Sequence, residues 1–145
     1  MKALIQRVSG ASVRVDGEVI GQIGAGLVVL LGIRHEDSEK DAEYLVQKIV
    51  NLRLFPSEKS GFDTSVLEEE NEVLVVSQFT LYGSCKKGRR PDFGEAARPE
   101  QAEDLYNSFV EKMRETGLHV ATGQFGAEMK VELVNDGPVT LMIES

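Results

Sequence analysis

Three polar residues that could take part in chemistry follow directly after an apolar stretch in the middle of the chain. Ser77, Gln78 and Thr80 come at the end of residues 73–76, which have the composition of a buried strand. Hydroxyl and amide groups are well placed there to bind a substrate, because buried strands end in loops where functional residues concentrate. The segment Ser77-Gln78-Phe79-Thr80 is therefore predicted to form part of a binding or catalytic site.

Covalent catalysis by one of these hydroxyls would require a nearby base. A serine or threonine nucleophile depends on a histidine or another base within hydrogen-bonding distance. The chain has two histidines, His35 and His119, and the sequence pattern places neither beside Ser77 or Thr80. Cys85 has basic neighbours but no evident base partner. A covalent nucleophile is therefore disfavoured, and without a Cys/His cluster we expect neither a zinc site nor another cofactor.

A second candidate site is the hexapeptide Asn135-Asp136-Gly137-Pro138-Val139-Thr140, which separates two strand-like runs. Proline cannot donate to a sheet ladder, so Pro138 predicts a turn or a sheet edge. Bonds that precede proline are also the ones most often cis. Carbonyl groups in such a turn point away from a sheet and can accept hydrogen bonds from a ligand. From the hexapeptide alone, however, an ordinary hairpin turn is the favoured interpretation.

Positive charges are concentrated in one loop after the first candidate site, although the whole chain carries a net charge of −8. Such a cluster on an acidic protein suits binding of one local phosphate group better than coating of a nucleic-acid duplex. A solvated surface loop explains the cluster equally well. Its members are Lys86, Lys87, Arg89 and Arg90.

Two aromatic residues, Phe93 and Phe125, are in loops with flanking glycines. Their rings could stack on a nucleic-acid base. Burial in the core is an equally good explanation for each of them.

The elements that position these residues follow from composition and periodicity. A chain of 145 residues, 41% hydrophobic and 28% charged, predicts one globular domain over 1–145. Apolar residues at helical spacing predict a helix over 39–51 and a second helix from Pro99 to a stop at Gly117. The single cysteine, the first residues and the short apolar runs lack the features of secreted and membrane proteins, so we expect a cytoplasmic location.

Extended segments account for most of the remaining chain. Strands are predicted at 2–9 and at 11–15, followed by a hairpin turn at Asp16-Gly17, and at 27–33. The acidic run 68–72 is predicted to form the turn of a further hairpin, between short apolar segments. We therefore expect an α+β fold, a single domain with a curved, mostly antiparallel, barrel-like sheet and two main helices.

Taken together, the two candidate segments resemble the signature motifs of the D-aminoacyl-tRNA deacylases. The first motif is Ser77-Gln78-Phe79-Thr80-Leu81 and the second is the hexapeptide, in the same order and in a chain of matching length. Similarity extends over the whole chain, at 6–8, at 88–93 and at 123–129. The resemblance implies a homodimeric hydrolase that cleaves the ester bond of D-aminoacyl-tRNA, with each active site at the subunit boundary.

The resemblance also implies roles for the two motifs. The carbonyls of a cis Gly137-Pro138 bond would enter the partner subunit's pocket and exclude L-amino acids by steric conflict, whereas glycine would pass. Main-chain N–H groups near Phe79 and Thr80 would stabilise the ester carbonyl, and the ribose 2′-OH would assist the reaction. Ser77 and Gln78 would shape the same pocket.

Further residues would bind the tRNA or support the site. Phe125 and Met129 resemble the residues that hold the terminal adenine, and the basic loop would contact acceptor-stem phosphates. Arg7 is expected to brace the Gly-Pro turn more than to touch substrate. Two other interpretations stay open: an editing deacylase for a mischarged L-amino acid, and a non-catalytic nucleic-acid binder on the same fold.

Overall fold

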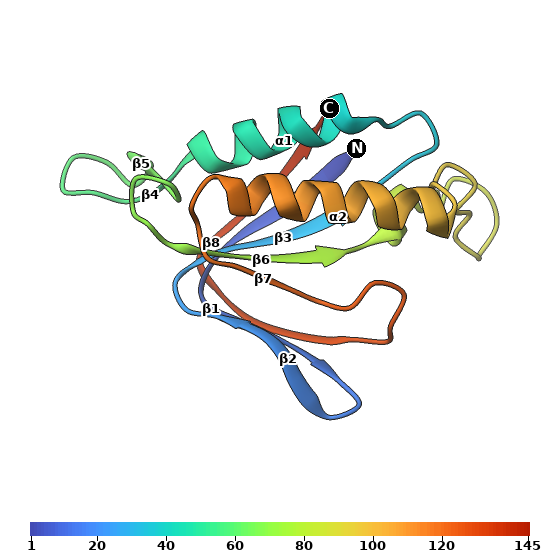
Figure 1. Ribbon diagram of the computed structural model, residues 1–145, viewed down its shortest axis with the longest axis horizontal. Coiled ribbons are helices and arrows are strands. Elements are labelled where there is room, and N and C mark those ends of the chain that lie inside the picture. Colours follow the sequence, from blue (N-terminus) through green and yellow to red (C-terminus); the bar gives the residue numbers. More distant parts are fainter.

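The computed structural model describes all residues, 1–145, and contains two α-helices, a six-stranded sheet and a separate two-stranded sheet (Figure 1). The elements in chain order are β1 (Lys2–Val15), β2 (Glu18–Ile23), β3 (Gly26–Gly32), α1 (Glu39–Asn51), β4 (Arg53–Phe55), β5 (Thr64–Ser65), β6 (Glu72–Ser77), η1 (Phe79–Tyr82), α2 (Pro99–Glu115), β7 (Val120–Thr122) and β8 (Lys130–Glu144).

The main sheet has the strand order β2-β1-β3-β6-β7, and β8 pairs with the other edge of β1. All three pairings of β1 are antiparallel, whereas the β3–β6 and β6–β7 pairings are parallel. The sheet curves until β2 contacts β7, where the backbone of Thr122 leaves no room for a side chain at Gly21. The predicted curved, mostly antiparallel, barrel-like sheet with two helices is thus confirmed.

Both helices lie side by side on one face of the sheet (Figure 1), and their apolar stripes form the larger core with it. Val73 and Val75 of β6 point into this core, whereas Leu74 and Val76 point into a second cluster on the opposite face. Burial on both faces explains the continuous apolar composition of β6. Neither helix is long and apolar enough to cross a membrane.

The local sequence signals gave the helix boundaries and the first hairpin correctly. Helix α1 begins with the capping box of Ser38 and Asp41, in which the Asp41 carboxylate accepts a hydrogen bond from the Ser38 N–H at 2.8 Å. Pro99 is the first residue of α2. Asp16 and Gly17 both have positive φ, which suits the tight turn between β1 and β2.

Two predicted breaks in strands are wrong. Residues 2–15 form one strand, because irregular pairing with β8 around Val8 lets the ladder continue past Ser9-Gly10. The hexapeptide 135–140 is not a hairpin turn, because β8 runs through it without reversing. Pro138 is tolerated there because β8 lies at the sheet edge and pairs only with β1.

The predicted acidic hairpin is also wrong. The apolar pair Val66-Leu67 before the acidic run lies in the turn itself; the preceding strand β5 pairs with β4, whereas β6 pairs in parallel with β3. Local hydrogen bonds hold the acidic turn: the Glu68 carboxylate accepts the Ser65 N–H at 2.8 Å, and the Ser65 hydroxyl accepts the Glu68 N–H at 3.1 Å. The apolar β6 strand is buried on both faces only in the middle of the sheet, and this burial decides its partner.

Candidate active site

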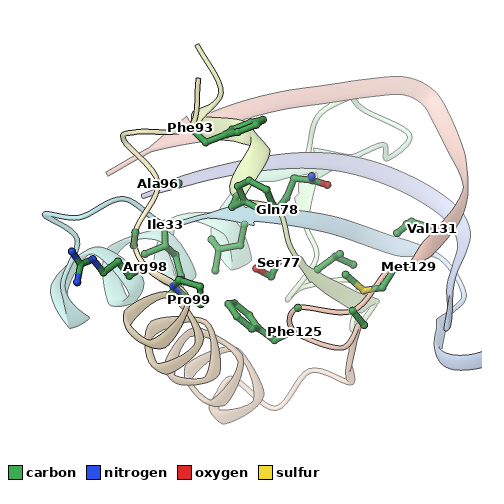
Figure 2. A pocket seen from close by; sticks show the side chains of 17 residues that line it. Ile33, Ser77, Gln78, Phe93, Ala96, Arg98, Pro99, Phe125, Met129 and Val131 are labelled. Atoms are coloured by element: carbon green, nitrogen blue, oxygen red, sulfur yellow. The ribbon is translucent and has the colours of Figure 1, made fainter. Parts of the chain in front are cut away.

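A cavity of about 660 Å³ opens between the end of β6, the start of α2 and the β7–β8 loop (Figure 2). Twelve of its 17 lining residues are hydrophobic. Cavities of this size and composition are typical of sites for small organic molecules or parts of larger ligands. Two other cavities in the structure have volumes of only about 290 Å³ each, so this one is the better candidate for a ligand site.

The first sequence motif forms one side of this cavity. Strand β6 ends at Ser77, the N–H of Gln78 still donates to the Leu31 carbonyl of β3 at 2.8 Å, and the chain then turns into the 3-10 helix η1. Ser77, Gln78 and Phe79 line the cavity, whereas Thr80 is exposed and does not. The Gln78 side-chain amide donates to the Thr80 hydroxyl, which ties the two residues together.

The backbone of this motif offers two hydrogen-bond donors. The N–H groups of Phe79 and Thr80 open η1, so they have no acceptor within that turn. Neither histidine lines the cavity: His35 contacts the Gly94 carbonyl at 3.1 Å, and His119 lies 3.4 Å from the Glu72 carboxylate. The site therefore offers donors for a carbonyl oxygen without a histidine base next to them.

The opposite wall carries an aromatic ring and a thioether. Phe125 and Met129 both line the cavity (Figure 2). The Phe125 ring packs at 6.0 Å against the ring of Tyr106, whose hydroxyl donates to the Val75 carbonyl at 2.9 Å. Burial raises the pKa of Tyr106 to about 12, so the hydroxyl remains a donor at neutral pH. Tyr106 thus links the cavity wall that carries Phe125 to the backbone of β6.

Phe93 lies at the edge of the cavity rather than in its depth. Its ring contacts the Phe79 ring edge to face, with 5.1 Å between the centroids. Phe79 is 55% exposed. The two rings therefore form a partly exposed aromatic rim at the entrance.

The Gly137-Pro138 segment lies outside the cavity of its own chain. Residues 136–139 have no partner in the β1–β8 register, and the Gly137-Pro138 bond is cis. Arg7 donates from Nε to the Asp136 carbonyl at 2.8 Å and from Nη1 to the Leu54 carbonyl at 2.6 Å. Gly137 has a φ of 143° and faces the Arg7 side chain, so the position favours glycine. Arg7 thus connects the backbone at the start of this segment to the backbone of β4.

A side-chain amide holds the other end of this segment. Asn135 accepts the Val139 N–H at 2.7 Å and donates to the Thr140 hydroxyl at 3.0 Å. These bonds and those of Arg7 fix the irregular backbone from both sides. Residues 136–138 are thus exposed at the sheet edge in a conformation that is hydrogen-bonded at both ends.

The basic residues 86–90 are exposed, and none of the four cations forms an ion pair. Mutual backbone hydrogen bonds between Ser84 and Asp92, at 2.7 and 2.9 Å, close the loop that carries them. Phe93 of the cavity rim follows directly. The loop and the cavity entrance therefore lie in the same connection between β6 and α2.

The start of α2 contributes cavity residues that the sequence interpretation missed, namely Ala97, Arg98, Pro99 and Ala102. The helix start at Pro99 was the available signal, because residues that open a helix after a long loop often border a site. The structure shows no group of three or more His, Cys, Asp or Glu side chains arranged to hold a metal ion.

Comparison with known proteins identifies the family. The family model described as D-Tyr-tRNA(Tyr) deacylase matches residues 4–144. Proteins named D-aminoacyl-tRNA deacylase from Bacillus thuringiensis (strain Al Hakam) and from Bacillus anthracis are each 58% identical over 145 residues, which cover 100% of this chain and 99% of theirs.

Two solved structures have the same fold. One, described as c-Myc DNA Unwinding Element Binding Protein, has a TM-score of 0.94 and 50% identity, covering 100% of this chain and 99% of that chain. The other, a probable eukaryotic D-amino acid tRNA deacylase, has a TM-score of 0.85, 18% identity and coverage of 99% and 98%. From the full-length family match and the close relatives, we conclude that this chain belongs to the D-Tyr-tRNA(Tyr) deacylase family.

Proposed function

We propose that this protein hydrolyses the ester bond between a D-amino acid and the terminal ribose of tRNA, releasing the free amino acid and tRNA. The observation that carries the proposal is the 58% identity to deacylases over the whole chain, combined with a cavity bordered by Ser77, Gln78 and Phe79. Release of a D-amino acid from aminoacyl-tRNA by catalytic amounts of the protein tests it.

The terminal adenosine is proposed to occupy the cavity, with its base against Phe125 and Met129. Both residues line an apolar wall of suitable size. The ester carbonyl would then accept hydrogen bonds from the N–H groups of Phe79 and Thr80. An activated ester needs little more than a positioned water and a stabilised oxyanion, and the ribose 2′-OH would assist.

Thr80 is proposed to position the site through its backbone and its contact with Gln78. Thr80→Ala removes a hydroxyl that has no base beside it. We therefore expect kcat for D-tyrosyl-tRNA to fall by less than about tenfold, a much smaller decrease than removal of a nucleophile causes. Single-turnover hydrolysis measures this effect. Complete loss of hydrolysis with unchanged tRNA binding would instead assign Thr80 a covalent role.

The protein is proposed to act as a homodimer in which Gly137-Pro138 of one subunit reaches the cavity of the other. The segment lies outside its own cavity and residues 136–138 are exposed, and β8, an edge strand, exposes the apolar side chains of Val134, Leu141 and Met142. An apolar edge of this kind is normally covered. In the partner's cavity the fixed carbonyls would conflict with an L side chain but accept a D-amino acid or glycine, including glycine mischarged on tRNA-Ala.

The loop of Lys86, Lys87, Arg89 and Arg90 is proposed to bind acceptor-stem phosphates. Replacing Lys86 and Lys87 with alanine should weaken tRNA binding several-fold and reduce the slope of log Kd against log salt by about one to two. Titration of tRNA at several salt concentrations measures both quantities. The same slope in the variant and the parent protein would show that the loop is only a solvated surface.

A second candidate function is binding of nucleic acid without catalysis. The 50% identical structure described as a DNA unwinding element binding protein favours it. Turnover separates the two candidates, because a binder would leave aminoacyl-tRNA intact. An editing deacylase for a mischarged L-amino acid would instead cleave the L-ester.

A further inference from the structure

Arg98 is the only charged residue among those that line the cavity. It is exposed, and its guanidinium makes no ion pair and no hydrogen bond within the chain. Figure 2 shows its side chain at the side of the cavity opposite Met129 and Val131. A free cation thus borders a mostly hydrophobic cavity, whose other polar side chains are Ser77 and Gln78, on a protein with a net charge of −8.

The backbone of Arg98 is fixed on both sides. The N–H of Ala97 donates to the Ile33 carbonyl at 2.9 Å, and the Arg98 carbonyl accepts the Ala102 N–H at 2.9 Å in the first turn of α2. Pro99, which follows, further restricts the Arg98 backbone to its extended conformation. The guanidinium can therefore change its position only by rotation about the side-chain bonds of Arg98.

We infer that Arg98 binds the phosphodiester on the 5′ side of the terminal adenosine, and this inference rests on the proposed function. An adenosine held against Phe125 carries one negative charge on its 5′ side, and the cavity offers one cation. The planar guanidinium fork binds two phosphate oxygens at once, a geometry that lysine does not provide.

The position of Arg98 also fits the path of the RNA strand. Residues 86–90 and the start of α2 lie at the same end of the molecule (Figure 1). A strand that leaves the cavity past Arg98 would approach this end of the molecule, where the four cations of the basic loop are exposed. Arg98 would thereby set the register of the terminal nucleotide, and the basic loop would add affinity.

Calorimetric titration with three probes tests the inference without requiring turnover. Adenosine lacks the phosphate, adenosine 5′-monophosphate carries it as a monoester, and the dinucleotide CpA carries it as a diester. The parent protein should bind both phosphate-containing probes about tenfold more tightly than adenosine, the usual effect of one charge-assisted contact.

Arg98→Ala should bring the three dissociation constants within about twofold of one another, and Arg98→Lys should keep part of the preference. Arg114→Ala is the matched control, because Arg114 is exposed, lies at the other end of α2 and is not a cavity residue. It should leave the preference unchanged. Thermal melting verifies that each variant is folded.

Equal binding of adenosine and the phosphate-containing probes by the parent protein would overturn the inference. So would a preference that survives in folded Arg98→Ala, or no binding of any probe. Tight binding of adenosine 5′-monophosphate together with no binding of CpA would indicate a site for a free nucleotide, and this result would also contradict the inference. Failure of the proposed function is detected separately, as absence of D-tyrosyl-tRNA turnover by a protein that still binds CpA.

Discussion

Replacing Pro138 with alanine is expected to lower the preference for D- over L-tyrosyl-tRNA by about tenfold or more, because small misplacements of a positioning group have large kinetic effects. Arg7 and Asn135 hold the neighbouring carbonyl and N–H groups, and the proline ring fixes φ at the projecting residue. Alanine leaves that φ free, so the carbonyls that exclude an L side chain are no longer rigidly placed. The ratio of kcat/KM for the two esters measures the effect.

Pro91→Ala is the control for this experiment. Pro91 is exposed in the basic loop, so its replacement can change tRNA binding, but such a change affects both esters equally and leaves their ratio intact. Light scattering should accompany the kinetics, since the segment is also proposed to lie in the dimer interface. An unchanged ratio in a stable Pro138→Ala dimer would remove the carbonyls from chirality selection.

Replacing Phe125 with alanine should reduce kcat/KM for D-tyrosyl-tRNA by about 10- to 100-fold, the range expected when one base loses its stacking partner. Phe125→Leu keeps an apolar side chain against Tyr106 and should lose less activity, because only the flat surface is removed. Steady-state kinetics of both variants separates stacking from general packing.

Tyr44→Leu is the control for the Phe125 variants, because it removes an aromatic ring elsewhere in the protein. Tyr44 is 50% exposed on α1 and does not line the cavity, so its replacement should leave kcat/KM unchanged. Normal activity of folded Phe125→Ala would place the terminal base somewhere other than this wall.

The sequence predicted those parts of the fold that depend on neighbouring residues. The capping box at Ser38, Pro99 at the start of α2 and the Asp16-Gly17 turn each act within a few residues, and the structure has all three. The pairing of β5 with β4, and of β6 with β3, depends on which strand is buried in the centre of the sheet. That choice is made between segments distant in sequence, and local patterns do not encode it.

The candidate site likewise contains residues that the local sequence predicted and residues that only the folded chain brings together. The polar end of β6 was visible as Ser77 and Gln78 after an apolar run, whereas Phe125 and Met129 were linked to it only through family resemblance. Folding brings them to one cavity because β7 pairs with β6 and delivers the following loop to the same end. Arg98 was missed because an arginine before a helix has no distinctive pattern of its own.

Release of tyrosine from D-tyrosyl-tRNA and from L-tyrosyl-tRNA at catalytic protein concentration separates a D-specific deacylase from an unselective esterase and from a nucleic-acid binder. We expect rapid, multiple-turnover cleavage of the D-ester and negligible cleavage of the L-ester. Cleavage of both at similar rates would leave an esterase but contradict selection by the Gly137-Pro138 carbonyls. Cleavage of neither, by a protein that binds tRNA, would contradict the proposed reaction and favour the nucleic-acid binder.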